Sequence, residues 1–117
     1  MHEMFKNWRN LKSLDLSNFN TSLLQNMCEI FNEYNNLIIF NLSNFDLSKT
    51  TKTKNLLSGC NYLEILDLAN LTVSEGTQIN SLSPNFPKLK YINFKKVCIK
   101  ILINVIIYLK MYLKIKL

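Results

Sequence analysis

A motif that recurs every 26 residues constrains the fold of this chain more than any other feature. Its first copy reads LKSLDLSNF, from Leu11 to Phe19, and four copies are present. Six columns of the alignment are apolar in every copy, whereas random placement of the same apolar content would produce only about one such column. These columns are Met4, Ile30, Leu56 and Leu82; Trp8, Tyr34, Cys60 and Phe86; Leu11, Leu37, Leu63 and Leu89; Leu14, Phe40, Leu66 and Ile92; Leu16, Leu42, Leu68 and Phe94; and Phe19, Phe45, Leu71 and Val97.

Each copy of the motif has the alternation of a short β-strand. Apolar and polar residues alternate in the central LDL, so the two leucines point to one face and the aspartate to the other. The segment after the first strand changes to a helical spacing over residues 21–31. Ser22 and Gln25 match a capping box there, so we expect a helix. The return segments of the later copies are polar or interrupted by glycine and proline, which favours turns.

Stacking of the repeats follows from the pattern. One repeat cannot bury its own apolar face, but repeats stacked side by side pair their strands into a parallel sheet and close a continuous core. We therefore predict an α/β solenoid of four 26-residue repeats over residues 4–97, with short parallel strands on one face and short helices or turns on the other. The first repeat begins without a polar cap, which indicates either a piece of a longer array or an end covered by something else.

Residues 98–117 form an irregular tail of apolar residues and lysines in which the period is lost. The longest uncharged run spans only residues 101–109, and a membrane-spanning helix needs about 20 residues. Alternation near the end favours a strand, whereas Tyr112, Ile115 and Leu117 match the spacing of the motif and favour a degenerate fifth repeat. A surface-lying amphipathic segment and sequence produced by a frameshift are the other interpretations.

The chain has little of what catalysis or metal binding requires. His2 is the only histidine, and Gly59 and Gly76 are the only glycines, so His-based triads, His-dependent metal sites and a glycine-rich phosphate cradle lack their residues. Three cysteines do not make a disulfide framework, and Cys60 occupies a core column. We therefore predict a protein that is not an enzyme and has no cofactor and no metal site.

The outward side of the strands is where we expect a binding site, because the inward side is committed to the core. One outward column places Ile39, Ile65 and Tyr91 next to one another, and an apolar strip rimmed by acids and amides suits protein recognition. In one alternative, residues 98–117 fold back over this strip and bury it; in another, the exposed apolar residues have no role. For the acid and amide column, the alternative is a structural ladder. The predicted binding residues are Ile39, Ile65, Tyr91, Asp15, Asn41, Asp67 and Asn93.

The motif also resembles a known family. At LKSLDLSNFNTS and LIIFNLSNFDLS, with the MF of Met4 and Phe5 and the SGC of residues 58–60, the chain is similar to the BspA-like branch of leucine-rich repeat proteins. The resemblance covers residues 4–97 and implies a curved leucine-rich repeat solenoid that displays its sheet for binding. It also implies a cell-surface location in bacteria or protists and a role in adhesion or host contact. The first residues lack the long apolar stretch of a secretory signal.

These observations lead to two functional hypotheses. The first is a non-enzymatic module, or a fragment of a longer surface protein, that binds a protein ligand through the strand face. The alternative is a membrane-associated structural protein whose tail contacts anionic lipid. Nucleic acid is not an expected partner, because the excess charge of this +6 chain lies mostly in the tail. The uncapped ends of the solenoid also offer a route to end-to-end self-association.

Overall fold

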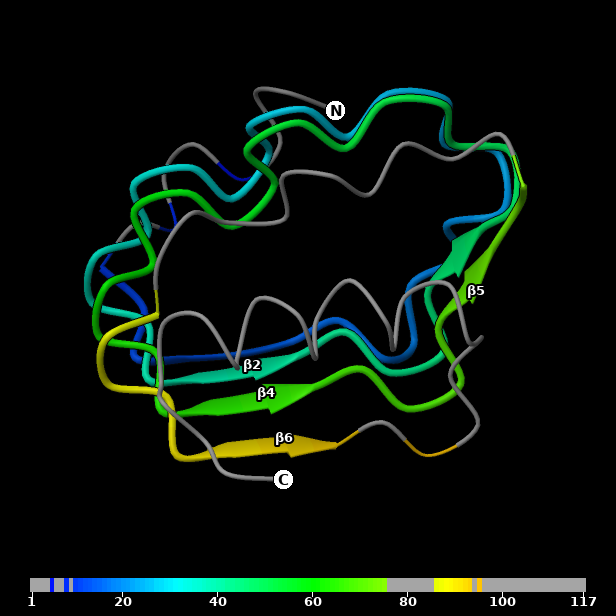
Figure 1. Ribbon diagram of the computed structural model, residues 1–117. Coiled ribbons are helices and arrows are strands. Elements are labelled where there is room, and N and C mark those ends of the chain that lie inside the picture. Colours follow the sequence, from blue (N-terminus) through cyan, green and yellow to red (C-terminus); the bar gives the residue numbers. More distant parts are fainter. Residues whose placement is uncertain (1–4, 6–7, 9, 76–85, 94, 96–117) are drawn as a thin grey trace.

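The strands form one parallel sheet and one small pair. The computed structural model describes residues 5, 8, 10–75, 86–93 and 95. In Figure 1 the strands of the main sheet run along one side, and the chain returns through turns along the opposite side. The main sheet contains β1 (Ser13–Asp15), β2 (Ile39–Asn41), β4 (Ile65–Asp67) and β6 (Tyr91–Asn93) in that order, and β3 (Asp46–Leu47) pairs with β5 (Thr72–Val73).

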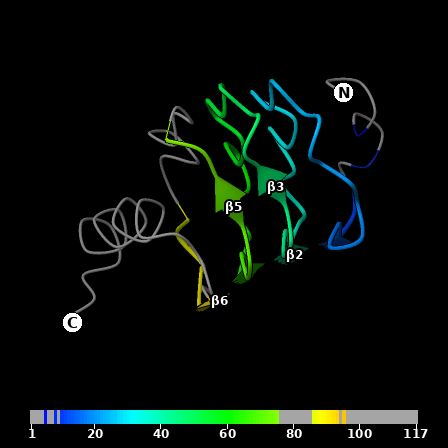
Figure 2. The same ribbon diagram turned by 90° about the vertical axis from the view of Figure 1, so that its right-hand side faces the viewer.

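The register of the main sheet follows the 26-residue period. Neighbouring strands are all parallel, and each residue lies beside the one 26 positions further along the chain. The prediction that Leu14, Phe40, Leu66 and Ile92 line up along one ribbon is therefore confirmed. Figure 2 shows the successive layers side by side. The division into four repeats over residues 4–97 stays a prediction, because much of the last two repeats lies outside the described residues.

The core lies between the main sheet and the turns. The middle residue of each strand points inward, so that Leu14, Phe40 and Leu66 are buried. Phe31, which comes from a turn segment, is also fully buried, and its ring centroid lies 4.7 Å from that of Phe40. The hydroxyl of Tyr34 donates a hydrogen bond to the carbonyl oxygen of Phe5. The columns of the sequence thus become layers of packed side chains.

Three residues of the apolar columns are exposed in the first repeat. Trp8, Leu11 and Phe19 keep 37%, 39% and 40% of their surface accessible, whereas their counterparts in the next repeat, Tyr34, Leu37 and Phe45, are buried. The difference arises because β1 is the first strand of the sheet, and no described layer lies in front of it.

The helix predicted over residues 21–31 is wrong. This segment consists of turns and a parallel bridge between Asn26 and Lys52. The amide of Met27 donates to the carbonyl of Lys52 at 2.9 Å, and the amide of Glu29 donates to that of Lys54 at 3.1 Å. A helix would direct these amides to carbonyls four residues earlier in the same segment, whereas here they join one layer to the next. The described residues contain no helix, so the part of the fold that they cover consists of strands and turns.

The capping box predicted at Ser22 and Gln25 is also absent. The amide and hydroxyl of Ser22 both donate to Oδ1 of Asn20, at 3.1 and 2.7 Å. The equivalent turn recurs in the next repeat, where the amide of Ser48 donates to Oδ1 of Asp46 at 2.9 Å. Short side chains that bind the backbone two residues ahead stabilise turns rather than helices. The side chains of Asn20 and Asp46, each two positions before its serine, therefore stabilise this turn.

Left-handed backbone conformations recur with the same period. Glu29 and Asn55 have φ values of 59° and 56°, and Glu33 and Gly59 have 65° and 83°. A side chain in this region costs about 1–2 kcal/mol, and glycine and asparagine tolerate it best. The two glutamates therefore adopt strained positions, and the next repeat fills the same positions with residues that suit them.

Candidate binding face

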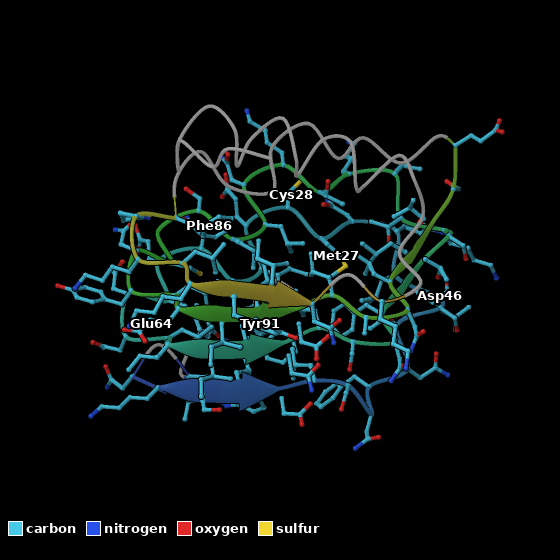
Figure 3. The ribbon with its side chains drawn as sticks, turned by 60° about the horizontal axis from the view of Figure 1, so that its bottom comes forward. Met27, Cys28, Asp46, Glu64, Phe86 and Tyr91 are labelled. Atoms are coloured by element: carbon cyan, nitrogen blue, oxygen red, sulfur yellow. The ribbon has the colours of Figure 1, made fainter. Side chains whose placement is uncertain are left out.

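The outward side of the main sheet carries the apolar strip that the sequence predicts. Ile39, Ile65 and Tyr91 are 41%, 37% and 58% exposed. The register places them directly beside one another on β2, β4 and β6, at a strand spacing of about 4.8 Å. Ser13 continues the column onto β1. Figure 3 views the strands from this side and labels Tyr91. Three large side chains thus form one continuous apolar strip across three strands.

The predicted acid and amide residues lie together at the carboxyl ends of the four strands. Each binds the backbone amide two residues ahead: Oδ1 of Asp15 accepts from Ser17 at 2.9 Å. Asn41, Asp67 and Asn93 make the equivalent bonds, to Ser43 at 2.9 Å, Ala69 at 2.8 Å and Lys95 at 3.1 Å. One oxygen of every side chain in the column is therefore committed to closing the turn after its strand.

These side chains also bond across the layers. Nδ2 of Asn93 donates to Oδ2 of Asp67 at 3.2 Å. Hydrogen bonds from the hydroxyl and amide of Ser17, with a weaker contribution from Asn41, hold the pKa of Asp15 below its ordinary value, because they stabilise the ionised carboxylate. The column thus forms a hydrogen-bonded ladder beside the apolar strip. Only the carboxylate and amide atoms of this column that make neither a turn hydrogen bond nor a bond to the next layer remain available to a ligand.

One exposed aromatic side chain near the strip was not predicted from the sequence. Tyr62 precedes β4 and is about half exposed, and Nζ of Lys88 lies 4.2 Å from the centroid of its ring. Two positions further along the chain, Oε2 of Glu64 forms an ion pair with Nζ of Lys90 at 3.0 Å. Tyr62 shares its column with two asparagines and a lysine, so it gave no periodic apolar signal. Its exposure is therefore a result of the tertiary structure.

The described residues carry no arrangement suited to metal chemistry, since they contain no cluster of three or more histidine, cysteine, aspartate or glutamate side chains. The Cys60 thiol is buried, and its burial raises the pKa to about 12, so it has little nucleophilic character. Within the same part of the chain no helix has the length and apolar character needed to cross a bilayer. The predictions made for His2 and for residues 98–117 lie outside the described residues.

Comparison with known proteins gave one finding. Neither the curated proteins nor the solved structures contain a match to this chain. A family model described as "Mycoplasma protein of unknown function, DUF285" matches residues 1–95, which include all four strands of the main sheet. The chain therefore belongs to the DUF285 family.

Proposed function

We propose that this chain is a non-enzymatic binding module, a solenoid of stacked repeats of the BspA-like leucine-rich repeat type whose strand face binds a protein ligand. The parallel register at a constant 26-residue step supports the stacking. The likeness of LKSLDLSNF and its copies to the BspA-like motif supports a place on a cell surface and a role in adhesion.

One observation carries the proposal: the exposure of Ile39, Ile65 and Tyr91 in a single register. Alternation along each strand sends the middle residue into the core, and its flanking residues face outward without being needed for packing. Burial of a large apolar side chain at an interface contributes about 1.5–3 kcal/mol, and tyrosine is among the residues that most often dominate binding energy. The hydrogen-bonded ladder beside the strip holds polar groups in fixed positions at its rim, as protein interfaces commonly require.

A selection experiment tests the strand face. Random peptides displayed on phage are selected on the immobilised full chain, and the selected peptides are then measured against Ile65→Asp and Tyr91→Asp. We expect each substitution to weaken binding about tenfold or more, because it places a charge within a desolvated apolar contact. Lys52→Asp is the matched control, because this exposed residue lies in a return segment away from the main sheet. Circular dichroism verifies that each variant is folded.

Two results would argue against this site. Peptides whose affinity is insensitive to both strand-face substitutions would show that binding occurs elsewhere on the chain. Peptides that lose affinity only with Lys52→Asp would place the binding surface on the return side.

A further inference from the structure

Three exposed lysines flank the β6 end of the apolar strip. Lys88 and Lys90 lie three positions and one position before Tyr91, and Lys95 lies four positions after it. By contrast, residues 36–43, which include β2 at the other end of the strip, contain no charged side chain. The positive charge beside the strip is therefore concentrated where Tyr91 is exposed.

The acidic side chains of the neighbouring strand are already engaged. The carboxylate of Glu64, just before β4, forms its ion pair with Lys90. Figure 3 labels Glu64 at the side of the sheet where the strands begin. At the opposite end of β4, Oδ2 of Asp67 accepts the hydrogen bond from Asn93. Within the described part of the chain, Lys88 is thus left without a carboxylate partner.

The amino-acid composition around β6 supports the same conclusion. The chain has eight acidic residues, and all of them except Glu3 belong to the described part. Residues 76–85 and 96–117 contain no acidic side chain. The charge of Lys88 is therefore not matched by an acidic side chain from the segments that precede and follow β6 in the sequence.

The ammonium group of Lys88 is nevertheless held in a defined position. It lies over the ring of Tyr62, in a cation–π contact. The two residues are one 26-residue step apart, and buried Leu63 and Leu89 follow them directly along the chain. A lysine that is already oriented loses less side-chain freedom on binding an anion than one that extends into water. Lys88 is therefore prepared to bind a negative group next to the apolar strip.

We propose that the strand face binds an acidic peptide segment whose apolar side chain packs on Ile65 and Tyr91 and whose carboxylate pairs with Lys88. The inference rests on the binding function proposed above and specifies the chemistry of its ligand. Because Lys88 stands three residues before Tyr91, their Cα atoms are at most about 11 Å apart. In an extended peptide, this span corresponds to an acid about two to four residues from the apolar side chain.

The other charges of the same face favour a peptide over a uniformly charged polymer. Asp15, Glu64 and Asp67 all lie in or next to strands of the main sheet. They would repel a polyanion such as nucleic acid, which requires a series of cations along its phosphates. One oriented lysine beside an apolar strip instead complements one carboxylate beside an apolar side chain.

The peptides selected on the full chain provide the ligands for the test. Those that lose affinity with Tyr91→Asp should be enriched in aspartate and glutamate relative to the starting library. One such peptide is synthesised with its acid and with the corresponding amide, and fluorescence anisotropy measures both against the unaltered chain and Lys88→Gln. We expect the amide peptide to bind the unaltered chain about threefold to fivefold more weakly than the acidic one, as for an exposed charge pair. Both peptides should bind Lys88→Gln equally well.

Lys52→Gln is the matched control, because it removes an exposed lysine of a return segment away from the main sheet. It should preserve the difference between the two peptides. The inference fails if peptides that depend on Tyr91 show no excess of acids, or if the difference persists in Lys88→Gln. Those results would leave binding at the strand face intact, whereas selected peptides insensitive to both Ile65→Asp and Tyr91→Asp would refute the proposed function as well.

Discussion

Gly59 is the position where a single added methyl group should do the most damage. Its φ of 83° lies in the left-handed region. A Cβ built there would stand 2.9 Å from the amide nitrogen and 3.0 Å from the Cα of Glu33, both backbone atoms of the preceding layer. The Glu33 amide also donates to the carbonyl of Ser58 at 2.9 Å, immediately before Gly59. The methyl group of Gly59→Ala would therefore push apart two layers at a point where they are hydrogen-bonded.

The expected destabilisation has three contributions. The left-handed conformation costs an alanine about 1–2 kcal/mol, and overpacking against backbone costs about 1–3 kcal/mol. Loss of glycine flexibility in the unfolded chain returns about 0.4–1 kcal/mol. We expect Gly59→Ala to lower the free energy of unfolding by about 2–4 kcal/mol.

Urea denaturation followed by circular dichroism measures this effect. With a urea dependence of about 1–3 kcal/mol per M, the midpoint should fall by about 1 M or more. Ser58→Ala is the control, because it alters the adjacent side chain without adding a Cβ, and it should change stability by no more than about 0.5 kcal/mol. Equal midpoints for the two variants would refute the close approach of the layers at Gly59.

Three other substitutions test the layered structure. Glu29→Asn should raise the free energy of unfolding by about 1 kcal/mol, because asparagine tolerates the left-handed conformation that Glu29 adopts; a decrease in the urea midpoint would contradict this. Leu63→Ala should cost about 2–5 kcal/mol, whereas Leu11→Ala, in the same column but exposed, should cost about 1 kcal/mol or less; equal losses in urea denaturation would contradict the difference in burial between the two leucines. Asp46 accepts hydrogen bonds from the Ser48 hydroxyl and amide that lower its pKa, so its contribution is present above its unfolded pKa of about 3.9 and is lost as pH falls through the lower folded value. In Asp46→Asn, stability should therefore fall less steeply below about pH 4 than in the unaltered chain. If the urea midpoint falls equally steeply with pH in both proteins, these hydrogen bonds do not contribute to stability.

The register and the core of the main sheet were predictable from the period. A constant step between equivalent residues makes every layer present the same side chain at the same height. Once Leu14 is assigned to the inward face, Phe40 and Leu66 must follow it. The exposure of Ile39, Ile65 and Tyr91 followed from alternation within each strand. These predictions needed only local geometry and repetition.

The return segment was not predictable in the same way. Residues 21–31 have apolar spacing that fits a helix, and Met27, Ile30 and Phe31 are indeed buried. The turns bury these three positions as a helix would, although they leave Leu23 of the same stripe 75% exposed, so the burial of Met27, Ile30 and Phe31 does not by itself distinguish the two. The backbone decides, because the amides of Met27 and Glu29 find carbonyls in the next layer. Those carbonyls belong to Lys52 and Lys54, each 25 positions further along the chain, and no window of local sequence contains them.

The amino-acid order was enough to predict that the chain repeats, which residues share a column and which side of each strand faces the core. The hydrogen bonds of the return segment, the exposure of Leu11 and Phe19, and the position of Tyr62 in solvent beside Lys88 depend on the folded chain. Periodicity contains only what all layers have in common. Hydrogen bonding between layers and the position of a layer at the end of the stack depend on which neighbours are present, and this information lies in the assembled fold.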